Sequence, residues 1–153
     1  MGIEQTIHTT SVFETEKCGA ELARKMLSDL SLPLFVALFG DLGVGKTAFV
    51  RGFASVVSPA SIVRSPTFAL VREYPAKPRS VFHFDMYRIT DEDELISIGF
   101  YDYLNRDGIC LVEWSENILE FLPSEHLRVT IEKDDPSNPD SRRITVTQEG
   151  GNL

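Results

Sequence analysis

The chain has 153 residues, enough for a mixed sheet with helices packed on it, so we expect a single domain spanning residues 1–153. Its formal net charge of −8, from 23 acidic and 15 basic residues, excludes a protein that binds nucleic acid by itself through a broad basic surface. No apolar run approaches the length of a membrane-spanning helix and the first residues lack a secretory pattern, so we expect a cytoplasmic protein without membrane attachment.

Periodicity and turn signals predict alternating strands and helices. Strands are expected at residues 3–10, 34–39, 68–74, 81–87, 109–114, 126–132 and 142–147. The first helix is expected to begin at a cap, Ser11 or Thr15, and to run to about Asp29, with Leu30 still in its apolar stripe. Further helices are expected at residues 46–57, 91–98 and 100–105, and a helical turn at 117–122.

The polarity of the strands predicts their places in the sheet. Residues 34–39 are apolar throughout, as in a central parallel strand, whereas residues 3–10 are largely polar, as at an edge. Residues 68–74 and 81–87 are expected to form a hairpin that adds antiparallel edges. We therefore predict an α/β fold, a mixed sheet with a parallel core, antiparallel edge strands and helices on both faces.

The segment after the central strand fits the pattern G-x-x-x-x-G-K-[ST] between a strand and a helix, which predicts a phosphate-binding loop. Glycines let backbone N–H groups approach phosphate oxygens, the lysine brings a cation to the β and γ phosphates, and the threonine offers a hydroxyl to Mg²⁺. The alternative, an accidental glycine-rich turn, has a chance of about half of one per cent in a chain of this length. The predicted loop comprises Gly40, Asp41, Leu42, Gly43, Val44, Gly45, Lys46 and Thr47.

Two acids lie at the ends of predicted strands, where ligands bind in open α/β sheets. Glu113 ends an apolar run, as an acid beside Mg²⁺ and the attacking water does; otherwise it is a solvated strand-end carboxylate. Asp85 shares one strand face with His83 and Tyr87, and it must meet a cation, a metal or water if buried. Its structural alternative is a pair with Arg88 or a lysine, and His83 alone fits a scaffold histidine.

The proline-bounded linker at residues 58–67 carries a hydroxyl, on Thr67, that could sense a γ-phosphate through Mg²⁺. The chain lacks the N-K-x-D element with which GTPases recognise guanine, so ATP is favoured.

Four motifs in this order and spacing resemble the TsaE family, formerly YjeE: GDLGVGKT at residues 40–47, SPTF at 65–68, HFDMYR at 83–88 and VEW at 112–114. The resemblance implies a P-loop NTPase-like fold, binding of ATP and Mg²⁺, and a partnership with TsaB and TsaD proteins that make threonylcarbamoyladenosine at adenosine 37 of tRNA. tRNA would then act only indirectly, through that complex.

Site roles follow from the same resemblance. Thr47 and Glu113 would ligate Mg²⁺, and Lys46 with the loop amides would hold phosphate. Asp85 would organise the hydrolytic water, and Thr67 would act as a switch-like hydroxyl. Trp114 would lie by the nucleotide or a partner surface, and adenine would lie near Ser11 and Thr15.

Three functions remain open on this evidence: an ATPase subunit that resets a tRNA-modifying assembly, a small-molecule P-loop kinase, and a regulatory nucleotide switch. The arginines nearest the motifs are Arg64 and Arg88, and a site without an arginine on the phosphate turns over slowly, so we expect low ATPase activity for the chain alone.

Overall fold

The computed structural model describes residues 3–67 and 69–150 of the chain. The strands are β1 (Glu4–Thr9), β2 (Phe35–Phe39), β3 (Val71–Tyr74), β4 (Ser80–Asp85), β5 (Gly108–Glu113), β6 (His126–Lys133) and β7 (Arg142–Glu149). The helices are α1 (Val12–Ser28), α2 (Lys46–Val57), α3 (Glu92–Ser97), α4 (Phe100–Leu104) and the 3₁₀ helix η1 (Ser115–Phe121).

All described strands form one mixed sheet in the order β1-β7-β6-β2-β5-β4-β3. The four middle strands, β6, β2, β5 and β4, run parallel, whereas β3, β7 and β1 pair antiparallel with their neighbours. Every residue of β2 is buried, as expected for a central parallel strand between two helical layers. The predicted fold class is confirmed.

The hairpin of β3 and β4 differs from the prediction in one respect. Only β3 is an antiparallel edge, because β4 pairs in parallel with β5 along its whole length and so belongs to the parallel core. The structure describes β3 from Val71 onward, and Phe68, where the strand was predicted to begin, lies outside the described residues.

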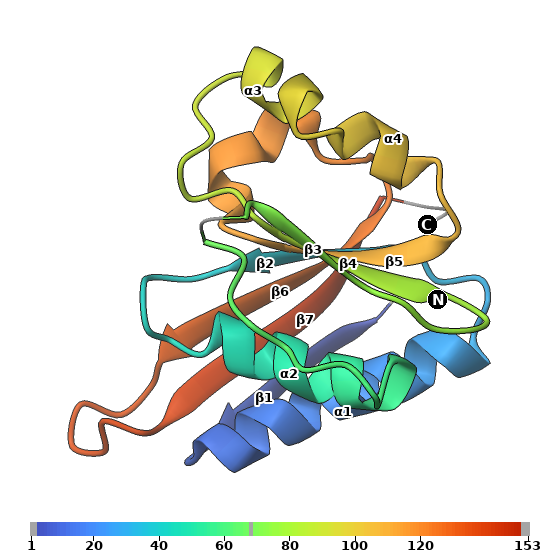
Figure 1. Cartoon of the computed structure of the whole chain (residues 1–153). Helices are drawn as coiled ribbons and strands as arrows, with labels where there is room; N and C mark the ends of the chain where they lie inside the picture. Colours follow the sequence, from blue (N-terminus) through green and yellow to red (C-terminus); the bar gives the residue numbers. More distant parts are fainter. Residues whose placement is uncertain (1–2, 68, 151–153) are drawn as a thin grey trace.

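Helices cover both faces of the sheet (Figure 1): α1 and α2 lie on one face, and α3, α4 and η1 on the other. Alternate side chains of β2 point to opposite faces of the sheet. Val36 and Leu38 pack in the core under α1 and α2, and Phe35, Ala37 and Phe39 pack in the core on the opposite face.

The two helices on the first face pack unusually closely. A Cβ at Gly52 would lie 1.7 Å from the carbonyl oxygen of Glu16, so this position in α2 tolerates only glycine without a shift of α1. The close packing fixes α1, and therefore Ser11 before it, relative to the start of α2.

Ser11 is the N-cap of α1, since its hydroxyl accepts a hydrogen bond of 3.1 Å from the N–H of Glu14. Thr15 lies inside the helix and is buried. The predicted apolar stripe was wrong at Leu30, which is 77% exposed because α1 ends at Ser28, before this residue, so Leu30 is not on the buried face of the helix.

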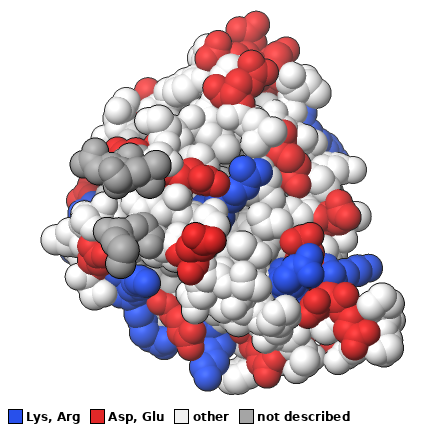
Figure 2. All heavy atoms as spheres, turned by 180° about the vertical axis from the view of Figure 1, so that it is seen from behind, with Lys and Arg blue, Asp and Glu red and all other residues white. Residues whose placement is uncertain are grey.

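The surface agrees with the acidic composition. On the face shown in Figure 2, acidic side chains are spread widely and basic side chains form separate small groups, so this face offers no continuous basic area among the described residues. Among the residues that the structure describes, no helix is both long enough and apolar enough to cross a membrane.

Candidate functional site

The loop between β2 and α2 has the backbone that the phosphate motif predicts. Gly40 has φ of 146° and Gly45 has φ of 114°, conformations that side-chain-bearing residues rarely adopt. A Cβ at Gly40 would also lie 2.5 Å from the backbone oxygen of Ile131 in β6. These glycines let the loop turn tightly at the carboxyl end of β2, where the first N–H groups of α2 are free to receive an anion.

Lys46 lies inside this loop and is only 4% exposed. Its Nζ donates a short hydrogen bond to the carbonyl oxygen of Gly40 and lies 3.6 Å from the ring centroid of Trp114. Burial lowers the pKa of Lys46, and the carboxylates of Glu116, Glu113, Asp85 and Asp41 act in the opposite direction. The side chain is therefore held between an aromatic ring and a set of acids, next to the backbone that forms the loop.

Thr47 and Glu113 meet directly although they come from different elements. The Thr47 hydroxyl, in the first turn of α2, lies 3.0 Å from Oε2 and 3.2 Å from Oε1 of Glu113, at the end of β5. Glu113 is 4% exposed, so it is not a solvated strand-end carboxylate. Its Oε2 also lies 2.5 Å from Nε2 of His83, whose buried ring comes from the neighbouring strand β4.

Asp85 is the partner of Glu113 in the parallel register of β4 and β5, which places the two acids side by side at the carboxyl ends of these strands. It too is 4% exposed. Its carboxylate accepts a hydrogen bond of 3.2 Å from the Thr67 hydroxyl and one of 2.9 Å from the N–H of Tyr87. Asp85 thereby connects the sheet edge to the linker of residues 58–67.

These groups surround one pocket of about 250 Å³. Its lining comprises Leu42, Gly43, Gly45, Lys46, Thr47, Ala48, Ser65, Thr67, Asp85, Glu113 and Trp114. Of the predicted loop residues, Gly40, Asp41 and Val44 lie outside this lining, and Gly40 and Asp41 face an adjacent groove of about 500 Å³ together with Glu116.

A second pocket, of about 240 Å³, adjoins the loop on the side of α1. It shares Gly43, Gly45 and Ala48 with the first pocket and is also lined by Ser11 and Thr15, the positions predicted near adenine. Apart from Gly40 and Asp41, which face the adjacent groove, the predicted site residues thus line two neighbouring pockets that share loop glycines.

Comparison with known proteins assigns the chain to a family. The family model described as "Threonylcarbamoyl adenosine biosynthesis protein TsaE" matches residues 9–144. The chain belongs to the TsaE family. The family is involved in tRNA threonylcarbamoyladenosine biosynthesis, and the resemblance seen in the four sequence motifs is confirmed.

Relatives in this family align over most of the chain. The Bacillus subtilis protein named "tRNA threonylcarbamoyladenosine biosynthesis protein TsaE" is 42% identical over 115 residues, covering 75% of this chain and 70% of the relative. The Haemophilus influenzae protein of the same name is 40% identical over 136 residues, covering 89% and 82%. The crystal structure of Bacillus subtilis YdiB is similar, with a TM-score of 0.75 and 32% identity, covering 98% of this chain and 88% of that chain.

The structure adds site residues that the sequence analysis missed in this TsaE-family chain. Glu116 accepts a hydrogen bond of 3.1 Å from the N–H of Gly40, and its other carboxylate oxygen is buried without a hydrogen-bond partner among the described residues. Arg142 of β7 holds the loop from outside, because its Nε donates to the carbonyl oxygen of Val44 at 2.8 Å. The position of Glu116, three residues after Glu113, is the one sequence signal that could have indicated it.

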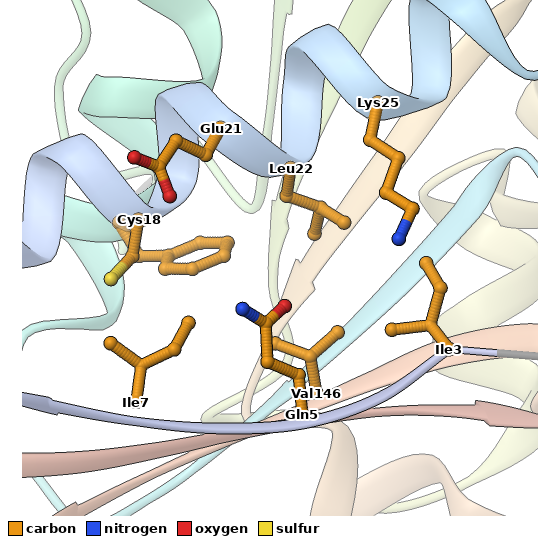
Figure 3. A pocket seen from close by; sticks show the side chains of 9 residues that line it. Ile3, Gln5, Ile7, Cys18, Glu21, Leu22, Lys25 and Val146 are labelled. Atoms are coloured by element: carbon orange, nitrogen blue, oxygen red, sulfur yellow. The ribbon is translucent and has the colours of Figure 1, made fainter.

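A pocket of about 250 Å³ between β1 and α1 is separate from this site (Figure 3). Most of its lining residues are apolar, and the polar ones are Gln5, which extends from β1, and Glu21 and Lys25 of α1. Burial raises the pKa of the Cys18 thiol there to about 11, so the thiol stays protonated near neutral pH and behaves as a small apolar group. This pocket contains none of the loop residues.

Proposed function

We propose that this TsaE-family chain is an ATPase that binds ATP and Mg²⁺ and acts on a complex of TsaB and TsaD type in tRNA threonylcarbamoyladenosine biosynthesis. The observation that carries the proposal is the single pocket where the glycine loop, Lys46, the Thr47–Glu113 pair and the Asp85–Thr67 pair converge. Each group has a role in γ-phosphate hydrolysis, and the roles are compatible with one another.

Lys46 and the loop amides would bind the phosphates. The Lys46 ammonium now contacts the Gly40 carbonyl and the Trp114 ring, and both are weaker partners than a phosphate oxygen. Binding of ATP would turn the ammonium toward the β and γ phosphates. Trp114 is the one tryptophan of the sequence, so its fluorescence would report this change directly.

The donor set at Thr47 and Glu113 fits Mg²⁺. A hydroxyl and a carboxylate supply hard oxygen ligands, which this ion prefers. No group of three or more His, Cys, Asp or Glu side chains among the described residues could hold a metal alone, which agrees with an ion that shares its ligands with substrate phosphates. The bound ion would neutralise charge on the β and γ phosphates.

Asp85 would orient the water that attacks the γ-phosphate, since its buried carboxylate faces the same pocket next to Glu113. Thr67 would position Asp85 and approach the nucleotide from the linker. Ser11 and Thr15 would border the adenine, because the pocket that they line continues from the glycine loop.

Low activity of the isolated chain follows from the charges around the pocket. No arginine is among the described residues that line it, and an arginine in the transition state contributes about 10³- to 10⁵-fold to such reactions. We infer that the partner complex supplies this charge or orders the linker. The net charge of −8 favours a route in which tRNA acts through that complex.

The test is steady-state phosphate release with the protein alone and with reconstituted TsaB and TsaD, at saturating ATP and Mg²⁺. We expect slow release alone and a rise of at least about tenfold with the partners, a small part of what an arginine can contribute. Equal rates would contradict the partner role, and failure of ATP to change Trp114 fluorescence or to bind in calorimetry would contradict the nucleotide site. Labelled phosphate on a small molecule would instead indicate a kinase.

A further inference from the structure

A buried chain of hydrogen bonds runs from the nucleotide pocket into the linker of residues 58–67. It begins at Glu113, whose Oε2 lies 2.5 Å from Nε2 of His83. Nδ1 of the same imidazole lies 3.3 Å from the hydroxyl of Tyr74. That hydroxyl in turn lies 3.2 Å from the backbone nitrogen and 3.1 Å from the backbone oxygen of Arg64. Two side chains, those of His83 and Tyr74, thus connect the acid beside Thr47 with the backbone of the linker.

The connection lies inside the protein. His83 is 0% exposed and Tyr74 is 5% exposed, and both belong to the face of the sheet covered by α2. They come from neighbouring antiparallel strands, with His83 opposite Arg72, two residues before Tyr74. A buried polar group that loses its hydrogen-bond partner costs free energy. A shift of Glu113 or of the Arg64 backbone therefore favours matching shifts of His83 and Tyr74.

The Tyr74 hydroxyl is the branching point of the connection. It has one proton and two acceptors within reach, the Arg64 carbonyl oxygen and Nδ1 of His83. Nδ1 of His83 stays within reach of Tyr74 only while the ring keeps the orientation set by its contact with Glu113, so the hydrogen bonds of Tyr74 with the linker depend on how Glu113 orients His83. Tyr74 also accepts a hydrogen bond from the N–H of Arg64.

The linker is tied to the pocket at a second point, three residues further on. Thr67 donates to Asp85, and Ser65 lies 2.7 Å from the Thr67 hydroxyl. Ser65 and Thr67 both line the pocket. Movement of Arg64 would therefore change the position of two hydroxyls that line the pocket, and with them the outer surface of the linker.

We propose that His83 and Tyr74 are positioning residues that couple the state of Glu113 to the conformation of residues 64–67, an inference that rests on the proposed nucleotide site. When the pocket is occupied, the contacts of Glu113 change and the His83 ring moves with the Glu113 carboxylate. Tyr74 then keeps or loses its hydrogen bonds with the backbone of Arg64. The linker then presents a nucleotide-dependent surface to a partner protein.

The test compares amide hydrogen exchange across residues 58–67 with and without ATP and Mg²⁺. In the unaltered protein we expect nucleotide to slow exchange in the linker by about fivefold, the lower end of coupling between two sites. In Tyr74→Phe the ring remains in the core and only the hydroxyl is lost, so nucleotide should still bind but the slowing should disappear. A purely structural role would raise exchange in both states and leave the ratio between them unchanged.

Tyr103→Phe is the matched control, because the Tyr103 hydroxyl makes no hydrogen bond among the described residues and its ring packs on the opposite face. It should keep the response of the unaltered protein. His83→Gln is the second variant: its amide can still donate to Glu113 but cannot also reach Tyr74, so it too should lose the response.

The outcomes separate this inference from the proposed function. Nucleotide binding without any change of linker exchange in the unaltered protein, or an intact response in folded Tyr74→Phe and His83→Gln, would overturn the coupling alone. Absence of nucleotide binding in the unaltered protein would overturn the proposed function together with the coupling.

Discussion

The phosphate loop of residues 40–47 and the linker of residues 58–67 face the same pocket but are held in different ways. The phosphate loop is fixed mainly by backbone geometry, because Gly40 packs against the backbone of Ile131 and α2 begins at Lys46. Hydrogen bonds with the side chains of Glu116 and Arg142 only add to this. The linker is held by side-chain hydrogen bonds: the Tyr74 hydroxyl donates to the carbonyl oxygen of Arg64 and accepts from its N–H, and the Thr67 hydroxyl donates to Asp85. Backbone packing changes little when a ligand arrives, whereas hydrogen bonds can exchange partners, so the site combines a preformed phosphate cradle with an adjustable wall.

The largest expected effect on nucleotide binding comes from removing the charge of Lys46 in the phosphate loop. Lys46→Ala should lower ATP affinity by about 10- to 100-fold, because a charge-assisted hydrogen bond contributes about 1.5–3 kcal/mol. Isothermal titration calorimetry with ATP and Mg²⁺ measures this loss. Lys25→Ala, which removes an exposed lysine of α1, is the control and should bind normally. Near-normal affinity and turnover in Lys46→Ala would refute the assignment of the phosphate cradle.

Asp85→Asn tests the acid that lies in the pocket between the phosphate loop and the linker of residues 58–67. The amide keeps the size of the side chain but cannot orient and polarise water as a carboxylate does, so hydrolysis should slow by about 10²-fold or more. ATP affinity should change little. Single-turnover phosphate release and calorimetry on the same preparation separate the two quantities. Loss of affinity with intact turnover would assign Asp85 to binding instead.

Glu113→Gln should have a smaller effect, confined to the dependence on Mg²⁺. A neutral amide is a weaker ligand for a hard cation, so the Mg²⁺ concentration for half-maximal turnover should rise by about tenfold. Excess Mg²⁺ should restore much of the rate. If this variant behaves like the unaltered protein while Asp85→Asn loses its Mg²⁺ response, the two acids have the reverse roles.

The smallest effect is expected from a change in the linker of residues 58–67. Thr67→Ala removes one partly exposed hydroxyl, so the stability of the isolated protein should change by less than about 1 kcal/mol and its slow turnover by a few-fold. The stimulation by TsaB and TsaD should fall more than the basal rate, because the linker then no longer reaches Asp85. Thr67→Ser, which keeps the hydroxyl, should retain the stimulation. Equal loss in both variants would mean that packing of the methyl group matters, and not the hydrogen bond.

The elements that local sequence predicts well are those whose pattern is complete within a short segment. The helix predicted at residues 46–57 has the observed bounds of α2, and the apolar run before it is the buried central strand β2. The glycine pattern between them predicted a phosphate-binding loop, and Gly40 and Gly45 have the positive φ angles that such a loop needs, a requirement that is local. Family membership also followed from short motifs in order.

Tertiary structure alone decided how distant segments meet. The parallel register of β4 with β5 places Asp85 beside Glu113, and it removed β4 from the antiparallel edge where it had been predicted. Glu116 reaches the N–H of Gly40 across 76 positions, and His83 meets Glu113 across 30. Period and composition within a segment determine which face a side chain occupies, but the partner that it finds there depends on strand order and register, which only the packed chain determines.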